Sequence, residues 1–390
     1  MAHRSGRHFL QIPGPTNVPD RVLRAMDHPT IDHRGPQFRT LASGLFADLP
    51  TVFRTEQPVV VYPSSGTGAW EAALVNTLSP GDRVLMYETG HFAALWANMA
   101  RRLGLDVEVL EGDWRSGVDP ARVEQHLAAD DDHATRAVAV VHNETSTGVT
   151  TDVAEVRRAI DRAGHPALLL VDTISSLASI DYRHDQWGVD VTVGGSQKGL
   201  MLPPGLGFNA VSQRARAAAS KARLPRSYWD WEDMLAANAN GVFPFTPATN
   251  LLYGLREAID MLLEEGLDQV FARHQRHAAA TRAAVDAWGL EIQCRVPSQH
   301  SGSLTGVQVG EAHDADAVRA VALERFDLSL GAGLGRLAGK MFRIGHLGDL
   351  GDLTLLGAIG GVEMSLTQAG VKPSASGLTA ASEHLANNEA

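Results

Sequence analysis

Cysteine is nearly absent from this chain, because Cys294 is the only one among 390 residues. That excludes an intrachain disulfide framework and leaves too few thiolates for a structural zinc site. The formal charge of −11 leaves no basic excess for a nucleic-acid partner. The closest histidine pair, His274 and His277, lacks the carboxylate motif of a metal protease, so we expect no metal.

Long apolar runs are missing as well. None approaches the roughly 20 residues that a bilayer-spanning helix needs, and the first residues lack the apolar core of a signal peptide. We therefore expect no membrane contact and a cytoplasmic location.

Lysine is scarce: the chain has four lysines, and its other strong bases are arginines. Lys198 stands in GGSQKGLMLPPG (194–205), directly after an apolar run. A desolvated lysine can lose its proton and attack a carbonyl, which arginine cannot do. The alternative is a surface lysine on a glycine loop, which the apolar and proline-rich flanks disfavour.

Short apolar runs alternate with amphipathic stretches between residues 55 and 212. This rhythm predicts an α/β fold with a mostly parallel sheet covered by helices, and ligands bind at the carboxyl ends of such strands. After residue 246 two long helical patterns lead into weaker strands, which predicts a smaller α+β domain. We expect a large domain up to residue 260 (21–260), a small domain (261–372) and a loose tail (373–390).

Further candidate residues follow predicted strands. In PSSGTGAWEAAL (63–74), Ser65, Gly66 and Thr67 join a strand to a helix, which predicts either a phosphate cradle or a plain N-cap turn. Asp172 closes the apolar run ALLLVD, and the alternative is a half-exposed loop acid. Arg343 interrupts KMFRIGHLG, where it either binds a carboxylate or forms a structural ion pair.

Together with Lys198, these residues match the chemistry of pyridoxal 5′-phosphate: a lysine for the imine, an acid for the pyridine nitrogen and a helix start for the phosphate. GAGLGRLAG (331–339) imitates a dinucleotide fingerprint, but Arg336 stands where the third glycine should fall. We expect a glycine loop lining a site there.

The chain resembles the class V aminotransferases, and more closely the serine–glyoxylate enzymes with their alanine–glyoxylate and aspartate–glyoxylate neighbours. The motifs that carry the resemblance are PGPTNVP, SSGTGAWEAAL, HNETSTGV, VDTISS, GSQKGLMLPPGL and FRIGHLGDL. The resemblance implies the fold type I architecture, with a seven-stranded sheet in the large domain. It also implies a homodimer whose active sites lie at the interface between the subunits. Assembly of such dimers into a higher oligomer stays open.

The resemblance also implies that an N-terminal segment (1–20) lines the site, and it implies roles for individual residues. Lys198 would carry the cofactor, and Asp172 would pair with its ring nitrogen. Phe92 would stack on the ring, and Thr145 would lie near its 3′ oxygen. The residues implied at the phosphate are Ser65, Gly66, Thr67 and Gln197, with Thr246 reaching across from the neighbouring subunit.

For the substrate, the resemblance implies that Arg343 binds the α-carboxylate. We predict amino transfer from serine, with alanine as a further donor, to glyoxylate, giving hydroxypyruvate or pyruvate and glycine. Asn17 or His346 would touch a serine hydroxyl. The alternative donor is aspartate, for which Arg34 is the candidate second cation; a cysteine desulfurase and an NAD-dependent dehydrogenase rank lower.

One departure from the family pattern concerns the cofactor. Relatives often have a tyrosine just before the TP pair, whereas this chain has Phe243 and Phe245 there. We expect weaker cofactor retention.

Overall fold

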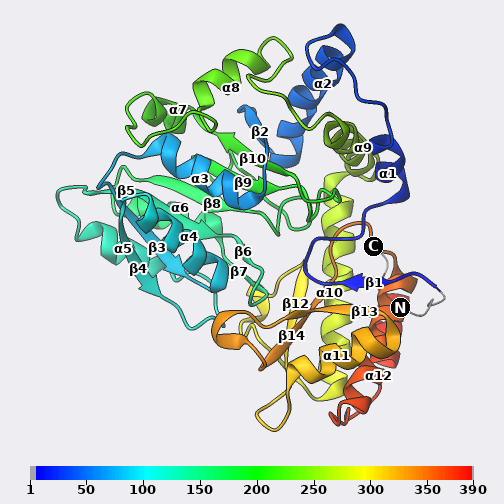
Figure 1. Cartoon of the computed structure of the whole chain (residues 1–390). Coiled ribbons are helices and arrows are strands. Elements are labelled where there is room, and N and C mark those ends of the chain that lie inside the picture. The colour runs from blue at the N-terminus through cyan, green and yellow to red at the C-terminus, as the bar shows by residue number, and fades with distance from the viewer. Residues whose placement is uncertain (1–5, 389–390) are drawn as a thin grey trace.

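The computed structural model describes residues 6–388 and contains two main sheets (Figure 1). The larger sheet has the order β2-β10-β9-β8-β5-β3-β4. Its strands are β2 (Val59–Pro63), β3 (Arg83–Glu88), β4 (Asp106–Glu111), β5 (Thr135–Val141), β8 (Leu168–Asp172), β9 (Val191–Gly195) and β10 (Leu206–Val211). All neighbours are parallel except that β10 runs antiparallel to β2 and β9. The predicted mostly parallel, seven-stranded sheet is confirmed.

Helices cover both faces of this sheet. Val84 and Met86 of β3 pack in the apolar cluster of α3 and α4, whereas Leu85 and Tyr87 pack in that of α5 and α6. The covering helices are α3 (Gly66–Thr77), α4 (His91–Arg102), α5 (Pro120–Ala128), α6 (Val153–Arg162) and α7 (Gln213–Ala219). Strands buried on both faces need apolar residues at every position, which is why continuous Val, Leu and Ala runs predicted them.

Further helices pack around the β2 end of the sheet (Figure 1). They are α1 (Asp20–Met26), α2 (Pro36–Phe53), α8 (Trp231–Asn238) and α9 (Thr249–Glu265). None of the helices in residues 6–388 has the length and apolarity that a membrane crossing requires.

The second sheet has five strands in the order β1-β13-β14-β12-β11. Its strands are β1 (Phe9–Gln11), β11 (Glu291–Ile292), β12 (Leu304–Gln308), β13 (Leu328–Ala332) and β14 (Met341–Gly345). The strand β1 comes from the start of the chain and pairs in parallel with β13, with Phe9 opposite Leu328. The helices packed with this sheet are α10 (Leu267–Trp288), α11 (Ala315–Phe326), α12 (Asp352–Gln368) and α13 (Gly377–Asn387). The remaining short elements are the β6 (Asn143–Glu144) and β7 (Val149–Thr150) pair and the 3₁₀ turns η1 (Pro297–Gln299) and η2 (Gly335–Leu337).

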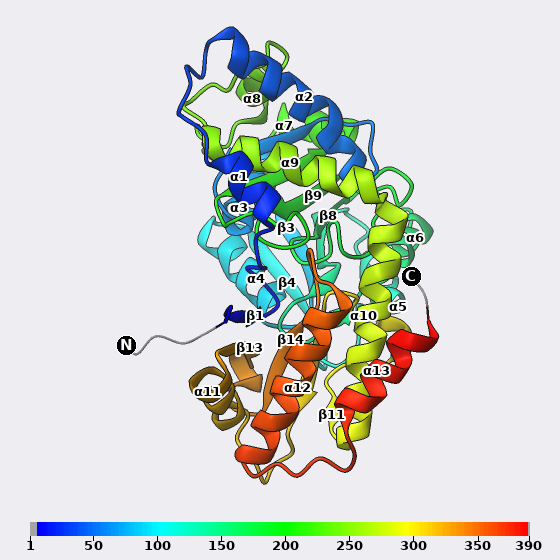
Figure 2. The same cartoon turned by 90° about the vertical axis from the view of Figure 1, so that its right-hand side faces the viewer.

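The helix α10 contributes to both cores (Figure 2). Val270 and Phe271 pack in the cluster of the larger sheet, whereas Ala284 and Trp288 pack in that of the smaller one. The domain boundary expected near residue 260 falls inside α9, and the exact division stays a prediction.

The loose end expected after Lys372 is wrong for residues 377–387, which form α13. Ala381 and Leu385 lie one helical turn apart and pack beside Trp288 of α10. The Ser- and Ala-rich composition suggested a loose tail because the apolar face of this helix is narrow. Such a face cannot be recognised in the sequence without knowledge of the residues that it packs against.

Candidate active site

Two ionisable side chains lie at the carboxyl ends of adjacent parallel strands. Asp172 is the last residue of β8, and Lys198 follows β9. Arg343 comes from β14 in the other sheet. The three residues are 4%, 8% and 7% exposed, and the charge of Lys198 is coupled to those of both others. The fold therefore brings together, from two sheets, three residues that the sequence indicated separately.

The Asp172 carboxylate has two neutral hydrogen-bond donors. Ile174 N donates to Oδ1 (2.7 Å) and Trp70 Nε1 donates to Oδ2 (3.1 Å). Burial raises the pKa of Asp172 to about 7, and the charge of Glu144 adds to this, while the two bonds and Lys198 oppose it. A cation held beside this carboxylate would be stabilised by its charge.

The Lys198 amine lies beneath the start of the chain. Its Nζ donates to the Pro13 carbonyl (2.6 Å), and Thr16 donates through N to Gln197 O (3.1 Å) and through Oγ1 to Lys198 O (3.2 Å). A Cβ on Gly14, whose φ is +108°, would lie 2.6 Å from Nζ, so only glycine fits there.

The protonation of Lys198 is also altered. Burial lowers the pKa of Lys198 to about 8, and the charge of Arg343 lowers it as well, against the opposite effect of Asp172. A sizeable fraction of the amine is therefore neutral slightly above neutral pH, as a nucleophile or general base requires.

The Arg343 guanidinium is a buried cation held by carbonyls. Its Nε donates to Ala332 O and its Nη1 donates to Thr145 O, both at 2.7 Å. Burial lowers the pKa of Arg343 to about 10, so the group stays charged at neutral pH. Arg343 forms no ion pair with any residue between 6 and 388, which disfavours the structural ion pair. The arrangement suits a carboxylate ligand, because two carbonyls fix the guanidinium plane.

The helix α3 begins without a side-chain cap. Side chains of Asp119, Asp152 and Ser212 accept bonds from the first-turn amides of α5, α6 and α7, respectively. Ser65, at the N-cap of α3, makes no such bond. The start of α3 therefore keeps its amides and the positive end of its dipole for another acceptor.

Gln197 completes this cradle. Its Oε1 is buried without a hydrogen-bond partner among the described residues. A Cβ built on Gly195 would lie 3.2 Å from this oxygen and 3.6 Å from Gly66 N, so the amide of Gln197 lies beside the start of α3. A phosphate would accept hydrogen bonds from the side-chain NH₂ of Gln197, the hydroxyls of Ser65 and Thr67 and the first amides of α3.

Phe92 and Thr145 lie close to this centre. The ring of Phe92, in the first turn of α4, is 6.5 Å from that of Trp70, centroid to centroid. The Thr145 hydroxyl donates to Ser175 Oγ (2.7 Å). The neighbouring Glu144 is a buried carboxylate that the sequence did not single out, since a lone acid in a polar motif carries no periodic signal.

Several candidates are not brought to this centre. His346 is fully buried, with its ring nitrogens 3.0 Å from Thr305 Oγ1 and 3.1 Å from Gly302 O, so our expectation of a substrate contact is wrong in this structure. Asn17 is exposed and donates to Leu10 O. Arg34 and Thr246 lie exposed in the loops before α2 and α9.

The family model for Aminotransferase class-V matches residues 8–335. The chain belongs to the class V aminotransferases. It is 52% identical to a serine–glyoxylate aminotransferase of Methylorubrum extorquens, over 99% of this chain and 98% of the relative. It is 48% identical to an L-aspartate–glyoxylate aminotransferase of Paracoccus denitrificans, over 96% and 95% of the two chains. The crystal structure of a pyridoxamine–pyruvate aminotransferase from Mesorhizobium loti superposes with a TM-score of 0.93 at 28% identity, covering both chains fully.

Features suggestive of other enzyme classes have structural roles in this class V aminotransferase. The GAGLGRLAG stretch ends β13 and forms η2 before the antiparallel β14, so it begins no βαβ unit. Cys294 is buried, and its Sγ lies 3.5 Å from the carbonyls of Val296 and Gln299. The thiol therefore does not lie on an exposed loop.

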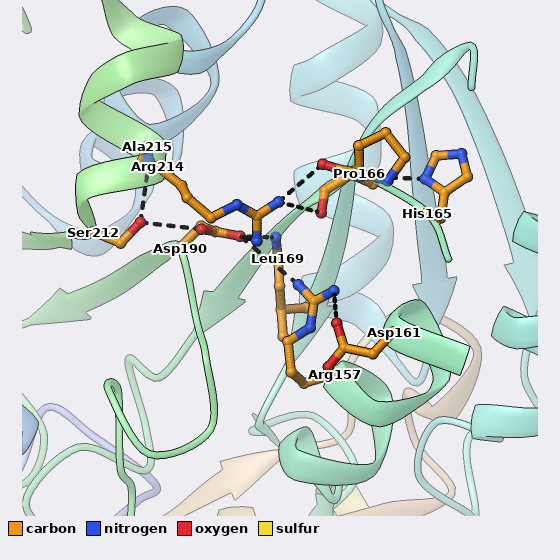
Figure 3. A network of polar contacts seen from close by, with 10 residues as sticks. Arg157, Asp161, His165, Pro166, Leu169, Asp190, Ser212, Arg214 and Ala215 are labelled. Atoms are coloured by element: carbon orange, nitrogen blue, oxygen red, sulfur yellow. Dashed lines mark hydrogen bonds and ion pairs between the residues drawn. The ribbon is translucent and has the colours of Figure 1, made fainter. Parts of the chain in front are cut away.

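A second charged cluster lies at the opposite, amino-terminal ends of β8 and β9 (Figure 3). Asp190 accepts bonds from Leu169 N (2.9 Å), Ser212 Oγ (3.1 Å) and Arg214 Nη1 (3.2 Å). Arg157 pairs with Asp161 at 2.6 Å. Because these carboxylates already have donors, the cluster ties α6 and α7 to the sheet.

Proposed function

We propose that this aminotransferase moves the amino group of L-serine to glyoxylate with pyridoxal 5′-phosphate as its cofactor. The observation that carries the proposal is the buried group of Lys198, Asp172 and Arg343 beside the uncapped start of α3. The serine–glyoxylate relative at 52% identity supports the choice of donor and acceptor.

The residues present fit the cofactor. The α3 amides with Ser65, Thr67 and Gln197 would hold its phosphate, and Asp172 would hold its ring nitrogen. The bound cofactor supplies an electron sink for the electrons left at the substrate α-carbon when that carbon loses its proton.

The chain's own residues bind the substrate and move its proton. Arg343, fixed by two carbonyls, orients the α-carboxylate. Lys198, neutral in part because its pKa is about 8, would accept the α-proton at Nζ and deliver it to the bound cofactor and not back to the α-carbon, as amino transfer requires. The segment around Pro13 and Gly14 covers the amine and keeps water from it.

Aspartate is the second candidate donor, because the relative from Paracoccus denitrificans at 48% identity carries that name. A dicarboxylate calls for a second cation, and Arg34, the candidate for that role, is exposed and comes from another loop. Serine has a single carboxylate and therefore needs no cation besides Arg343, and the relative at 52% identity supports serine as the first candidate.

The test is a half-reaction panel on purified holoenzyme. L-Serine, L-alanine and L-aspartate are added singly, with D-serine as the control, while the visible absorbance of the bound cofactor is followed. Loss of absorbance with L-serine, restored by glyoxylate, supports the proposal. Loss with L-aspartate alone contradicts it in favour of aspartate–glyoxylate exchange and makes Arg34 the next residue to replace.

We further propose a homodimer in which Thr246 reaches the phosphate bound by the neighbouring subunit; its exposure in the loop before α9 is consistent with this role. Light scattering of the holoenzyme tests the oligomeric state. The cytoplasmic location stays a prediction.

A further inference from the structure

The start of α4 is held by a segment far from it in sequence. Three successive amides of its first turn donate to the segment 144–146: His91 N to Ser146 Oγ (2.9 Å), Phe92 N to Glu144 Oε1 (3.3 Å) and Ala93 N to Glu144 Oε2 (3.1 Å). Gly90, the residue at the N-cap, has no side chain to do this. The position of Phe92 therefore depends on the Glu144 carboxylate.

The same short segment holds Arg343. The residue between Glu144 and Ser146 is Thr145, whose carbonyl accepts from Arg343 Nη1 (2.7 Å). Glu144 Oε1 also accepts from Ser146 N (3.0 Å) and Ser146 Oγ (2.6 Å), which fixes the backbone on the far side of Thr145. One carboxylate thus helps to set the geometry of two groups, Phe92 on the helix α4 and Arg343 on the strand β14.

Burial of the Glu144 carboxylate carries a large desolvation cost. Its side chain is fully buried, and within residues 6–388 no lysine, arginine or histidine forms an ion pair with it. Burying a carboxylate is costly unless several donors surround it, and here four donors and the dipole of α4 do so. Glu144 packs directly against the backbone of Gly90, because a Cβ on Gly90 would overlap Glu144 Cγ. A plain N-cap by serine or aspartate would cap α4 at lower cost.

We propose that Glu144 is a positioning residue that holds Phe92 against the cofactor ring and Arg343 against the substrate carboxylate at the same time. The inference rests on the proposed function. The charge of Glu144 also raises the pKa of Arg343, against the lowering effect of burial. Glu144 thereby helps to keep Arg343 charged.

The test replaces Glu144 by glutamine, which keeps the shape and one acceptor but presents an NH₂ group to an amide donor. We expect the circular dichroism of the bound cofactor in the visible range to change, since it reports the orientation of the ring. We also expect the Kd of the holoenzyme for 3-hydroxypropionate, which is serine without its amine, to rise about 10-fold, the size of one lost hydrogen bond to a charged group. Neither readout needs turnover, so their failure is distinct from failure of serine transamination by the wild type.

The matched control is Asp190→Asn. Asp190 is also a buried carboxylate (2% exposed) that accepts a hydrogen bond from a backbone amide, that of Leu169. It lies at the amino-terminal ends of β8 and β9, away from the candidate active site (Figure 3). Both variants should melt at lower temperature, and only Glu144→Gln should change the dichroism and the Kd. If Glu144→Gln behaves like Asp190→Asn, Glu144 is a helix cap alone and the proposal is overturned.

A second variant keeps the proposal testable if Glu144→Gln does not fold. Ser146→Ala removes the acceptor of His91 N and one donor to Glu144. It should change the dichroism and the Kd in the same direction by a smaller factor. If Glu144→Gln does not fold and Ser146→Ala leaves both the dichroism and the Kd unchanged, the proposal is overturned. The hydrogen-bond network around Glu144 would then matter for folding alone.

Discussion

Replacing Asp172 by asparagine should change how the stability of the cofactor-free protein depends on pH. Burial raises the pKa of this carboxyl in the folded protein from 3.8 to about 7. The native state therefore holds the proton more tightly than the unfolded chain does. The stability that protonation gives is complete below about pH 4 and is lost as the pH rises through about 7.

The magnitude follows from the shift. At about 1.4 kcal/mol per pKa unit, the raised pKa lowers the free energy of unfolding, relative to its value below pH 4, by about 2 kcal/mol at pH 5, where only the unfolded chain has released the proton, and by about 4 kcal/mol at pH 8. Asparagine has no charge to desolvate, but its Nδ2 cannot accept the bond from Trp70 Nε1, which costs roughly 1–3 kcal/mol at either pH. The difference between variant and wild type should therefore move by about 2–3 kcal/mol in favour of the variant between pH 5 and pH 8, whatever the lost bond costs.

The assay is urea unfolding of both cofactor-free proteins at fixed concentration from pH 5 to pH 8. Asp132→Asn, in an exposed loop, serves as the control and should follow the wild-type pH profile. A constant difference in unfolding free energy between Asp172→Asn and the wild type across this range would refute the reasoning, because the carboxyl would then titrate as it does in the unfolded chain.

Further predictions concern the proposed chemistry. Lys198→Arg keeps the charge but cannot supply a neutral amine, so serine–glyoxylate turnover should fall below detection; measurable turnover would move the base elsewhere. Arg343→Lys loses the planar fork, so KM for serine should rise roughly 10- to 100-fold while cofactor absorbance is unchanged; an unchanged KM would contradict the carboxylate role. Phe245 is half-buried and stacks on Tyr228 at 4.5 Å. Phe245→Tyr should tighten cofactor binding, measured by equilibrium dialysis, and unaltered affinity would contradict the expected effect of the missing hydroxyl.

The elements predicted best were those that need only local patterns. Six of the seven strands of the larger sheet were predicted from apolar runs because both of their faces are buried, whereas the edge strand β4 has no fully buried residue. Asp172 and Lys198 were singled out because each follows such an apolar run. The two-residue strand β6, which carries Glu144, is too short for any periodicity.

The rest depended on contacts between distant parts of the chain. No sequence pattern near His346 indicates that one of its ring nitrogens forms a hydrogen bond with Thr305. Trp70 reads as an ordinary helix residue until the fold places its Nε1 on Asp172. Likewise, nothing in the first residues predicts that Phe9 pairs with Leu328.

The pairing of β1 with β13 also bears on how the enzyme matures during synthesis. His8 and Asp327, joined by a hydrogen bond at the edge of this pair, are 319 residues apart in the sequence. Domains generally fold in order as the chain is made, N-terminal parts first. The strand β1 can pair with β13 only after almost the whole polypeptide has left the ribosome. The segment around Pro13, which follows β1 and covers Lys198, is therefore fixed late. A nascent chain can thus complete the larger sheet early while Lys198 stays uncovered, so activity should appear only as the last strands are added.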